Sequence, residues 1–239
     1  MDFTLDELKS AMLIQTKKND IVSNNLANVN TIGFKKDYTF FDAYEKKMAK
    51  VNNLSIQTVK DFSQGEFEDT NNPLDFAISG DGFFNIDADG ETVYTRNGHF
   101  ELNDEGYLVD NQGNYVLGEN GRINLQTNFE TVNNIFVNGE GEIYVDNILA
   151  DQFKLSGFND NAQVERLSGS VFRLKNPDAV SEQQSDAVVV QGKIEQSNVN
   201  PVKEMVNLIE LQRGFESSQR TIRILDEALS KASTQISRV

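Results

Sequence analysis

The residue types that most often carry out chemistry are sparse in this chain, which has one histidine and no cysteine. Without cysteine there is no disulfide framework, no thiolate catalysis and no cysteine metal site. A lone histidine, His99, also excludes the usual histidine-rich metal clusters and any Ser-His pair elsewhere in the chain. Because His99 follows the turn signal Asn97-Gly98, we interpret it as a surface turn residue rather than a catalytic base.

Acidic and glycine-rich stretches offer further candidates for a site. Asp87-Ala88-Asp89-Gly90 is similar to the start of a calcium loop, but the third acidic or amide position and the later glutamate of such a loop are missing. Gly80-Asp81-Gly82 lacks the spacing of a phosphate-binding loop. Acidic pairs such as Asp104-Glu105 are expected by chance, because residues 36–191 contain 27 carboxylates. We therefore predict no catalytic residue, no metal and no cofactor, and a protein that is not an enzyme.

The two ends of the chain carry a heptad pattern instead. From Pro201 onward, apolar residues recur at the two seam positions of an a/d repeat, and the first 29 residues repeat the pattern less regularly. This spacing predicts a helix over residues 5–28 and a second one that begins at Pro201, with Asn200 as its N-cap. The predicted assembly contacts on these helices are Leu5, Leu8, Met12, Val22, Leu26, Leu208, Leu211, Phe215, Ile222, Leu225, Leu229 and Ile236.

Charge divides the chain in the same way. The formal net charge is −15, and residues 36–191 alone hold a net −16, whereas residues 1–35 and 192–239 are nearly neutral. The acidic balance argues against a nucleic-acid binder, because phosphate backbones need clustered Lys and Arg. The acidic start Met1-Asp2-Phe3 is unlike a secretory signal, and no apolar run is long enough to predict a membrane span. These features predict neutral ends that pack closely and a solvated middle.

The middle of the chain changes to a strand pattern. From Leu74, short apolar runs alternate with turn signals such as Asp89-Gly90, Asn97-Gly98 and Glu105-Gly106. Short strands at this spacing indicate an antiparallel all-β domain. We therefore predict an α+β fold, in which long N- and C-terminal helices form a coiled-coil-like core and flank a central antiparallel β domain.

Three separate stretches carry a family resemblance. Residues 23–35 read SNNLANVNTIGFK, residues 72–84 read NPLDFAISGDGFF, and residues 196–202 read QSNVNPV. Together, and in this order, they closely resemble the signatures of bacterial flagellar rod and hook proteins, over nearly the whole chain. Gly214-Phe215 departs from the Ala that many relatives carry. The signature positions are Asn24, Asn25, Leu26, Ala27, Asn28, Gly33, Phe34, Gly80, Gly82, Phe83, Phe84, Ser197, Asn198 and Val199.

This resemblance implies an axial structural subunit of the flagellar basal body. Its terminal helices would pair into an inner core around an export channel, and its subunits would stack helically into an open tube. The implied partners are copies of itself, other rod and hook axial proteins, and the flagellar type III export apparatus, with no nucleic acid, membrane insertion or small-molecule substrate. The implied location is the rod on the periplasmic side, reached without a cleaved signal peptide.

The resemblance also divides the chain and ranks the members of the family. We expect residues 1–33 and 193–239 to supply the helices of the core, residues 34–71 to form a partly extended connector, and residues 72–192 to form the β domain. The short connector favours the proximal rod protein over the distal rod protein, and both over a short hook-type subunit. Two other classes explain less: a secreted acidic β-domain adhesin leaves the heptad ends unexplained, and a coiled-coil scaffold leaves the β domain unexplained.

Overall fold

The computed structural model describes residues 5–41, 56–125, 134–158, 164–175 and 182–236. The chain forms two compact units. The helical unit contains Met1–Ala27, Asp37–Val59 and Asn200–Val239, and the β unit contains Asn28–Lys36 and Lys60–Val199. The chain therefore passes between the two units four times, and three separate segments of it belong to the helical unit.

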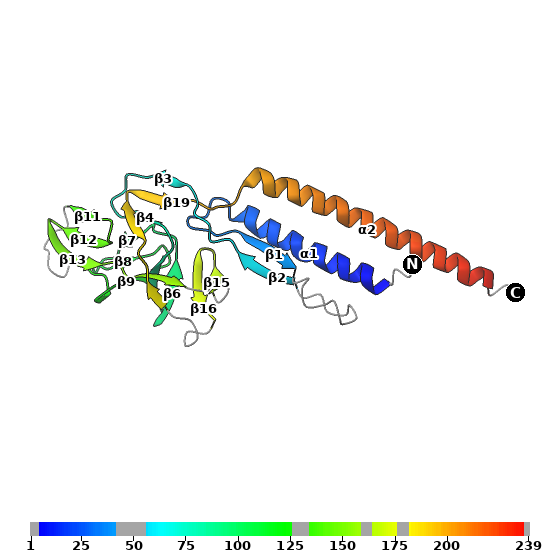
Figure 1. The fold of residues 1–239 in the computed structure, drawn as a ribbon, viewed down its shortest axis with the longest axis horizontal. Coiled ribbons are helices and arrows are strands. Elements are labelled where there is room, and N and C mark those ends of the chain that lie inside the picture. Colours follow the sequence, from blue (N-terminus) through cyan, green and yellow to red (C-terminus); the bar gives the residue numbers. More distant parts are fainter. Residues whose placement is uncertain (1–4, 42–55, 126–133, 159–163, 176–181, 237–239) are drawn as a thin grey trace. The chain divides into compact units, whose positions relative to one another are not determined.

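The helical unit is built on two helices that lie side by side, α1 (Leu5–Ala27) and α2 (Pro201–Ile236) (Figure 1). Both predicted helices are confirmed, and Asn200 caps α2 as expected, because its Oδ1 accepts a 3.0 Å hydrogen bond from the Lys203 N–H. The unit also contains the two-stranded sheet of β1 (Asp37–Phe41) and β2 (Ile56–Lys60). Within the described residues, no helix is long and apolar enough to cross a membrane.

The β unit is antiparallel throughout its described strand pairs and is built around one large sheet. The main path of that sheet is β15-β16-β6-β5-β9-β8-β7, and β10, β14 and β17 attach at its sides. The ten strands are β5 (Phe83–Ala88), β6 (Glu91–Thr95), β7 (Glu101–Leu102), β8 (Leu108–Val109), β9 (Tyr115–Gly118), β10 (Gly121–Arg122), β14 (Leu155–Phe158), β15 (Val164–Ser168), β16 (Val171–Leu174) and β17 (Glu182–Gln184).

Three smaller sheets complete this unit. They pair β11 with β12 and β12 with β13, β18 with β4, and β19 with β3. Their strands are β3 (Phe67–Asp69), β4 (Phe76–Ser79), β11 (Ile135–Val137), β12 (Glu142–Val145), β13 (Ile148–Gln152), β18 (Val188–Gln191) and β19 (Lys193–Glu195). The observed fold class is therefore α+β, with a central antiparallel β domain and two helices.

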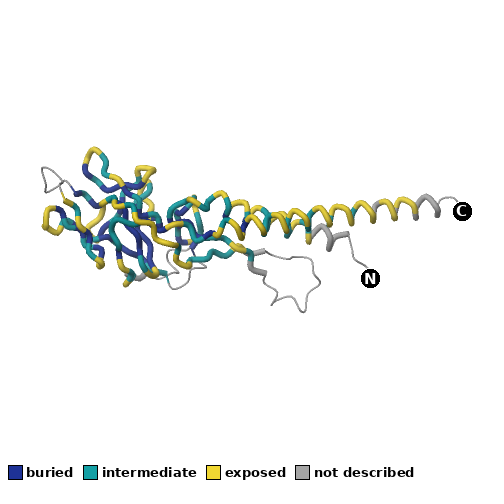
Figure 2. Tube along the Cα trace, turned by 90° about the horizontal axis from the view of Figure 1, so that it is seen from above, coloured by how far each residue is buried: buried dark blue, intermediate teal, exposed yellow. Residues whose placement is uncertain are grey.

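Strand β5 connects the two apolar clusters of the β unit. Successive residues of a strand point to opposite faces, so the adjacent signature residues Phe83 and Phe84 enter different clusters. Phe84 packs edge-on against Phe100, with 5.3 Å between ring centroids, and Phe83 packs against Phe172 at 5.8 Å. Figure 2 shows the buried residues concentrated in this unit, whereas most of α2 is exposed or intermediate.

Two of the predicted turn signals contain a glycine, and each glycine has a different structural reason. Asp89 and Gly90 connect β5 to β6 with φ angles of 54° and 89°, the left-handed values that a tight two-residue hairpin turn needs. Gly98 serves a different purpose, because a Cβ at this position would lie 1.8 Å from the Phe76 carbonyl oxygen. The Asn97-Gly98 signal therefore marks a close approach of two backbones.

Candidate functional site

The side chains that the sequence offered as candidates for chemistry make structural contacts instead. Asp87 accepts a 2.8 Å hydrogen bond from the Gly90 N–H and pairs with Arg122 at 2.7 Å, and the hydrogen bond from Arg122 lowers the pKa of Asp87. This carboxylate therefore closes its hairpin turn, as the sequence suggested. Among the described residues, no group of three or more His, Asp or Glu side chains is arranged to hold a metal ion.

The single histidine also has a local structural role. His99 Nδ1 lies 2.6 Å from Oδ1 of the buried Asp75, which also accepts a hydrogen bond from Asn72 Nδ2 at 3.1 Å. The backbone of Asp75 forms an isolated bridge with His99, and its carbonyl accepts from the Gly192 N–H at 2.8 Å. The His99–Asp75 pair thus fastens the start of β4 to its neighbours. The sequence placed His99 in a turn but could not identify this partner.

At the end of α1, an amide of the family signature caps a strand. Asn25 is buried, its Oδ1 accepts from the Asp37 N–H at 2.9 Å, and its Nδ2 donates to the Asp37 carbonyl at 2.7 Å. The side chain therefore pairs with the first residue of β1 as a neighbouring strand would. Asn28 Oδ1 accepts a 3.1 Å bond from the Thr31 hydroxyl. Asn24 and Ala27 are exposed, and Leu26 is half-buried.

Three segments that are far apart in the sequence converge in the β unit, and we call them the junction: residues 33–36, 61–66 and 194–199. The Gly33 N–H donates to the Glu195 carbonyl at 2.7 Å, and the Asn198 N–H donates to the Phe34 carbonyl at 3.3 Å. The Phe34 ring is 1% exposed, and the Arg166 guanidinium lies 4.1 Å from its centroid. In sequence, the first segment of the junction begins a few residues after α1, the second follows β2, and the third ends shortly before α2.

Gly33 is required by the backbone of the junction. Its φ is +67°, and a Cβ at this position would lie 2.5 Å from the Arg96 carbonyl carbon and 2.6 Å from the Asn97 nitrogen. Any side chain would therefore meet backbone atoms in a conformation that L-residues rarely adopt. The glycine of the Gly33-Phe34-Lys35 signature is explained by this close approach.

A buried group of three charges lies at the centre of the junction. Lys35 Nζ is 2.7 Å from Glu195 Oε1, and Arg96 Nη1 is 3.4 Å from Glu195 Oε2. The three side chains are 2% exposed or less. Lys35 also donates to the Ser63 carbonyl at 2.8 Å, and the Gly65 N–H donates to Glu195 Oε1 at 2.8 Å. One carboxylate thus neutralises two cations that come from distant parts of the chain.

Burial and ion pairing shift the pKa values of Lys35 and Arg96 in opposite directions. Burial, the largest influence, lowers the pKa of Lys35 below its ordinary value, while the Glu195 carboxylate raises it. Burial also lowers the pKa of the Arg96 guanidinium, again against the influence of Glu195. Because an unpaired ion in such surroundings is costly, Glu195 is the residue on which the group depends.

Asn198 connects all three segments of the junction through its side-chain amide. Its Oδ1 accepts from the Lys36 N–H at 2.7 Å. Its Nδ2 donates to the Asp61 carbonyl at 2.8 Å and to the Ser63 carbonyl at 3.0 Å. The amide therefore replaces backbone pairing between segments that form no common strand.

Truncating this amide is expected to loosen the β unit. We expect Asn198→Ala to lower the free energy of unfolding by about 2 kcal/mol, because the Lys36 N–H and the Asp61 carbonyl lose the hydrogen bonds that this amide makes with them. Urea denaturation followed by tyrosine fluorescence measures the change. Asn111→Ala, at an exposed turn position, is the matched control and should stay within about 0.5 kcal/mol. Equal effects in the two variants would contradict the role given to Asn198.

The remaining signature residues divide between the junction and the core. The Gly80 carbonyl accepts from Arg96 Nη2 at 2.8 Å, and Ser197 Oγ accepts from the Val199 N–H at 3.3 Å. Val199 is buried. Gly82 lies apart from the junction, where a Cβ would come within 2.6 Å of Ser185 Oγ. The signature is therefore a set of backbone and packing requirements.

The predicted assembly residues lie on α1 and α2. Some lie where the two helices face each other, and others lie on the later part of α2. Met12, Val22, Leu26, Leu208, Leu211, Phe215 and Ile222 are half-buried. Gln15 Nε2 donates to the Leu211 carbonyl at 2.9 Å across the pair, and Gly214 leaves room for the Gln15 amide, which a Cβ would meet at 2.3 Å. The side chains of Leu5, Leu8, Leu229 and Ile236 lie outside the described part of the structure.

A second apolar row on α2 was missed by the heptad analysis. Val202 is 68% exposed, and Met205, Val206 and Ile209 are each close to half exposed. Their spacing of three and four residues places them along one side of the helix. The signal was present in the sequence, but the stronger seven-residue repeat beside it concealed this row.

Comparison with known proteins connects these features to one family. The family model described as "Flagella basal body rod protein" matches residues 6–35. The "Flagellar hook protein FlgE/F/G D1 domain" matches residues 77–145, and the "Flagellar basal body rod FlgEFG protein C-terminal" matches residues 190–235. The matched segments contain nearly all of α1 with Gly33 and Phe34, the part of the middle signature from Ala77 onward, and Asn198 with nearly all of α2.

Whole-chain relatives give the same result. The flagellar basal-body rod protein FlgF of Caulobacter vibrioides is 32% identical over 226 positions, which cover 91% of this chain and 91% of that protein. The chain belongs to the flagellar basal-body rod protein family. The rod protein FlgF of Mesorhizobium japonicum is 31% identical over 219 positions, covering 90% of this chain and 89% of that protein. The rod protein FlgG of Buchnera aphidicola from Schizaphis graminum is 30% identical over 254 positions, covering 94% and 96%.

The family assignment confirms the resemblance derived from the three sequence signatures. The chain is a structural subunit of the bacterial flagellar basal-body rod. In this rod subunit, the junction fixes three chain segments that lead to the helical unit, and the helices present apolar surface. The site of interest is thus the buried junction together with the apolar surface of the two helices.

Proposed function

We propose that this rod subunit polymerises helically through its terminal helices, as part of the drive shaft and export channel. The observation that carries the proposal is the unequal length of the helices. α2 has 36 residues and α1 has 23, so α2 is longer by about 20 Å at 1.5 Å per residue. Towards its C-terminal end, Ile224 is 66% exposed and Leu225 is 39% exposed. Apolar side chains on such an extension favour burial against other subunits.

An open helical tube accounts for this kind of surface. Heterologous contacts, in which one face meets a different face of the next copy, repeat without closing into a ring. In the proposed division, residues 1–33 and 193–239 form the inner, coiled-coil-like core, residues 34–71 the connector and residues 72–192 the outer β domain. The proposed contacts are the seam residues together with the second apolar row of α2. The role is structural, and no reaction is assigned.

The proposed partners are copies of this chain and other axial proteins of the rod and hook. We propose export through the flagellar type III apparatus without cleavage of a signal peptide, and assembly on the periplasmic side of the basal body. The absence of cysteine supports this route, because a chain without thiols forms no disulfide on its way out.

Among rod positions, we propose the proximal rod, with the distal rod as the alternative. Support comes from the short connector of residues 36–71, because in the family that the chain resembles the distal rod protein usually has a longer connector at this place.

Electron microscopy of basal bodies from a strain that lacks this gene tests the proposal. We expect basal bodies without the rod beyond the membrane ring, and cells without hook or filament. A rod stub that lacks only its outer part would favour the distal position. A complete basal body in a swimming cell would contradict an axial role altogether.

A further inference from the structure

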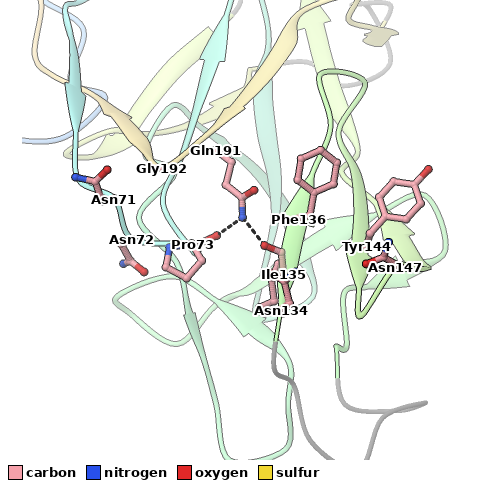
Figure 3. Close-up of a pocket in the computed structure, with 10 residues that line it drawn as sticks. All are labelled: Asn71, Asn72, Pro73, Asn134, Ile135, Phe136, Tyr144, Asn147, Gln191 and Gly192. Atoms are coloured by element: carbon pink, nitrogen blue, oxygen red, sulfur yellow. Dashed lines mark hydrogen bonds between the residues drawn. The ribbon is translucent and has the colours of Figure 1, made fainter.

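A polar pocket opens on the β unit, and none of the residues assigned above to assembly or to the junction is among its lining residues (Figure 3). Its volume is about 690 Å³, within the range of about 300–1,000 Å³ typical of small-ligand sites. The residues that carry the argument are Asn71, Asn134, Phe136, Tyr144, Asn147 and Gln191. Among the described residues, its lining contains no charged side chain, although residues 36–191 are strongly acidic.

Two aromatic rings form one side of the pocket. Phe136 on β11 and Tyr144 on β12 are cross-strand partners, with ring centroids 6.2 Å apart. Phe136 is 55% exposed, so a face of its ring is accessible to a ligand. The Tyr144 hydroxyl donates to Glu142 Oε2 at 2.7 Å, and this bond raises the pKa of Tyr144. The hydrogen bond to Glu142 holds the tyrosine hydroxyl in place.

Three asparagines, Asn71, Asn134 and Asn147, also line the pocket (Figure 3). Within the described part of the chain, the side chains of Asn71, Asn134 and Asn147 make no hydrogen bond. Each primary amide offers two donors and an acceptor. Asn71 and Asn147 have φ angles of 57° and 68°, so these two amides stand on backbone that is fixed in left-handed turns. The pocket therefore combines exposed ring faces with unused, neutral hydrogen-bonding groups.

The edge of β11 beside the pocket is already closed by Gln191. Its Oε1 accepts from the Val137 N–H at 3.1 Å. Its Nε2 donates to the Ile135 carbonyl at 3.0 Å and to the Pro73 carbonyl at 2.8 Å, the two bonds drawn in Figure 3. These backbone groups are the ones that an added peptide strand would need. The glutamine side chain thus occupies the edge and disfavours recognition of an extended peptide by strand addition.

The remaining ligand classes are separated by charge and polarity. An anionic ligand, such as a nucleotide, would meet no cation among the described lining residues, and the chain itself carries a net charge of −15. A purely apolar ligand would leave the asparagine amides covered and unpaired, which is costly. A sugar ring, in contrast, stacks its C–H face on an aromatic ring and directs its hydroxyl groups to amides. We propose that this pocket binds a short neutral oligosaccharide.

Ligand-observed NMR saturation transfer on the purified full chain tests this proposal, with chitotetraose and maltotetraose as probes. We expect at least one of them to bind, and Phe136→Ala to weaken binding by about tenfold or more, because the stacking face is lost. Asn147→Gly should weaken it as well, since glycine keeps the positive φ and removes only the amide. The matched control is Ile148→Ala on the same sheet, which removes an exposed apolar side chain that does not line the pocket.

The outcomes separate clearly once circular dichroism has shown that the variants are folded. Loss of binding in the two pocket variants, with none in Ile148→Ala, supports the oligosaccharide site. Failure of both glycans to bind at millimolar concentration overturns it, as does binding that neither pocket variant changes. A capped, uncharged Thr-Val hexapeptide is tested in parallel, and its binding in place of the glycans would overturn the assignment in favour of a peptide site. Polymerisation plays no part in this test, so its result is independent of the proposed rod position.

Discussion

Glu195→Gln is expected to lower the free energy of unfolding of the β unit by about 3–5 kcal/mol, the range found when one partner is removed from a buried ion pair. Glu195 is fully buried and is the carboxylate shared by Lys35 and Arg96. Glutamine keeps the size of the side chain but removes its charge, so two buried cations lose their counter-ion. A loss of this size is a large fraction of the total stability of an ordinary domain.

The effect should come from the cations left behind, and a second substitution tests this reason. In the double variant Lys35→Met/Glu195→Gln, one of the two cations that would lack a counter-ion is removed. The other, Arg96, keeps its hydrogen bond to the Gly80 carbonyl at 2.8 Å. We therefore expect the double variant to be more stable than Glu195→Gln alone by about 1 kcal/mol or more, a coupling typical of contacting residues.

Urea denaturation of the full chain, followed by tyrosine fluorescence, measures both variants. Four of the six tyrosines, Tyr94, Tyr107, Tyr115 and Tyr144, belong to the β unit, so the signal reports mainly on this part. Glu66→Gln, at an exposed carboxylate of the junction, is the matched control and should change stability by less than about 0.5 kcal/mol. If Glu195→Gln proved as mild as this control, the buried charges would not hold the junction as described.

The local features of this chain could be predicted because their signals are local. The bounds of α1 and the start of α2 follow from heptad spacing and from the Asn200-Pro201 cap, and the β5–β6 turn follows from Asp89-Gly90. Each of these depends on residues within a few positions of one another. The family resemblance could be recognised for a similar reason, because it rests on short, contiguous motifs.

The junction and the pocket could not be predicted because their parts are distant in the sequence. Lys35 and Glu195 are separated by 160 positions, and nothing near Lys35 indicates which carboxylate of an acidic chain will be buried beside it. Gln191 closes the edge of β11, more than 50 positions earlier. The sequence marked Gly33 as part of a motif, but only the approach of the Arg96 backbone explains why it must be glycine.

For the helices, the sequence predicted which residues are apolar but not which of them are covered within one subunit. Leu211 and Phe215 are half-buried, whereas Leu225 of the same heptad seam is 39% exposed. A heptad repeat states only that a partner exists. Because α1 is shorter than α2, the earlier part of the heptad repeat in α2 packs within the subunit, whereas its later part is exposed. The two roles of the repeat can therefore be tested separately.

A charge placed on the exposed part of the seam is expected to stop assembly while leaving the subunit folded. Leu225→Asp removes an apolar side chain that the proposed rod contact buries and replaces it with a carboxylate that must be desolvated. A cost of about 3 kcal/mol per contact raises the concentration needed for polymerisation by about 100-fold. Since each subunit of an open polymer repeats the same contact, a strain that carries this variant should lack rods and should not swim.

Gln219→Asp separates the effect of position from the effect of charge. It adds the same negative charge to an exposed site of the same helix, but it stands outside the a/d seam, so rods should form and cells should swim. Circular dichroism and tyrosine fluorescence of the purified variants should match the unmodified subunit, because Leu225 is more than a third exposed within one copy. Normal rods in Leu225→Asp would show that the seam ends before this residue, and assembly would then have to rely on the Val202–Ile209 row.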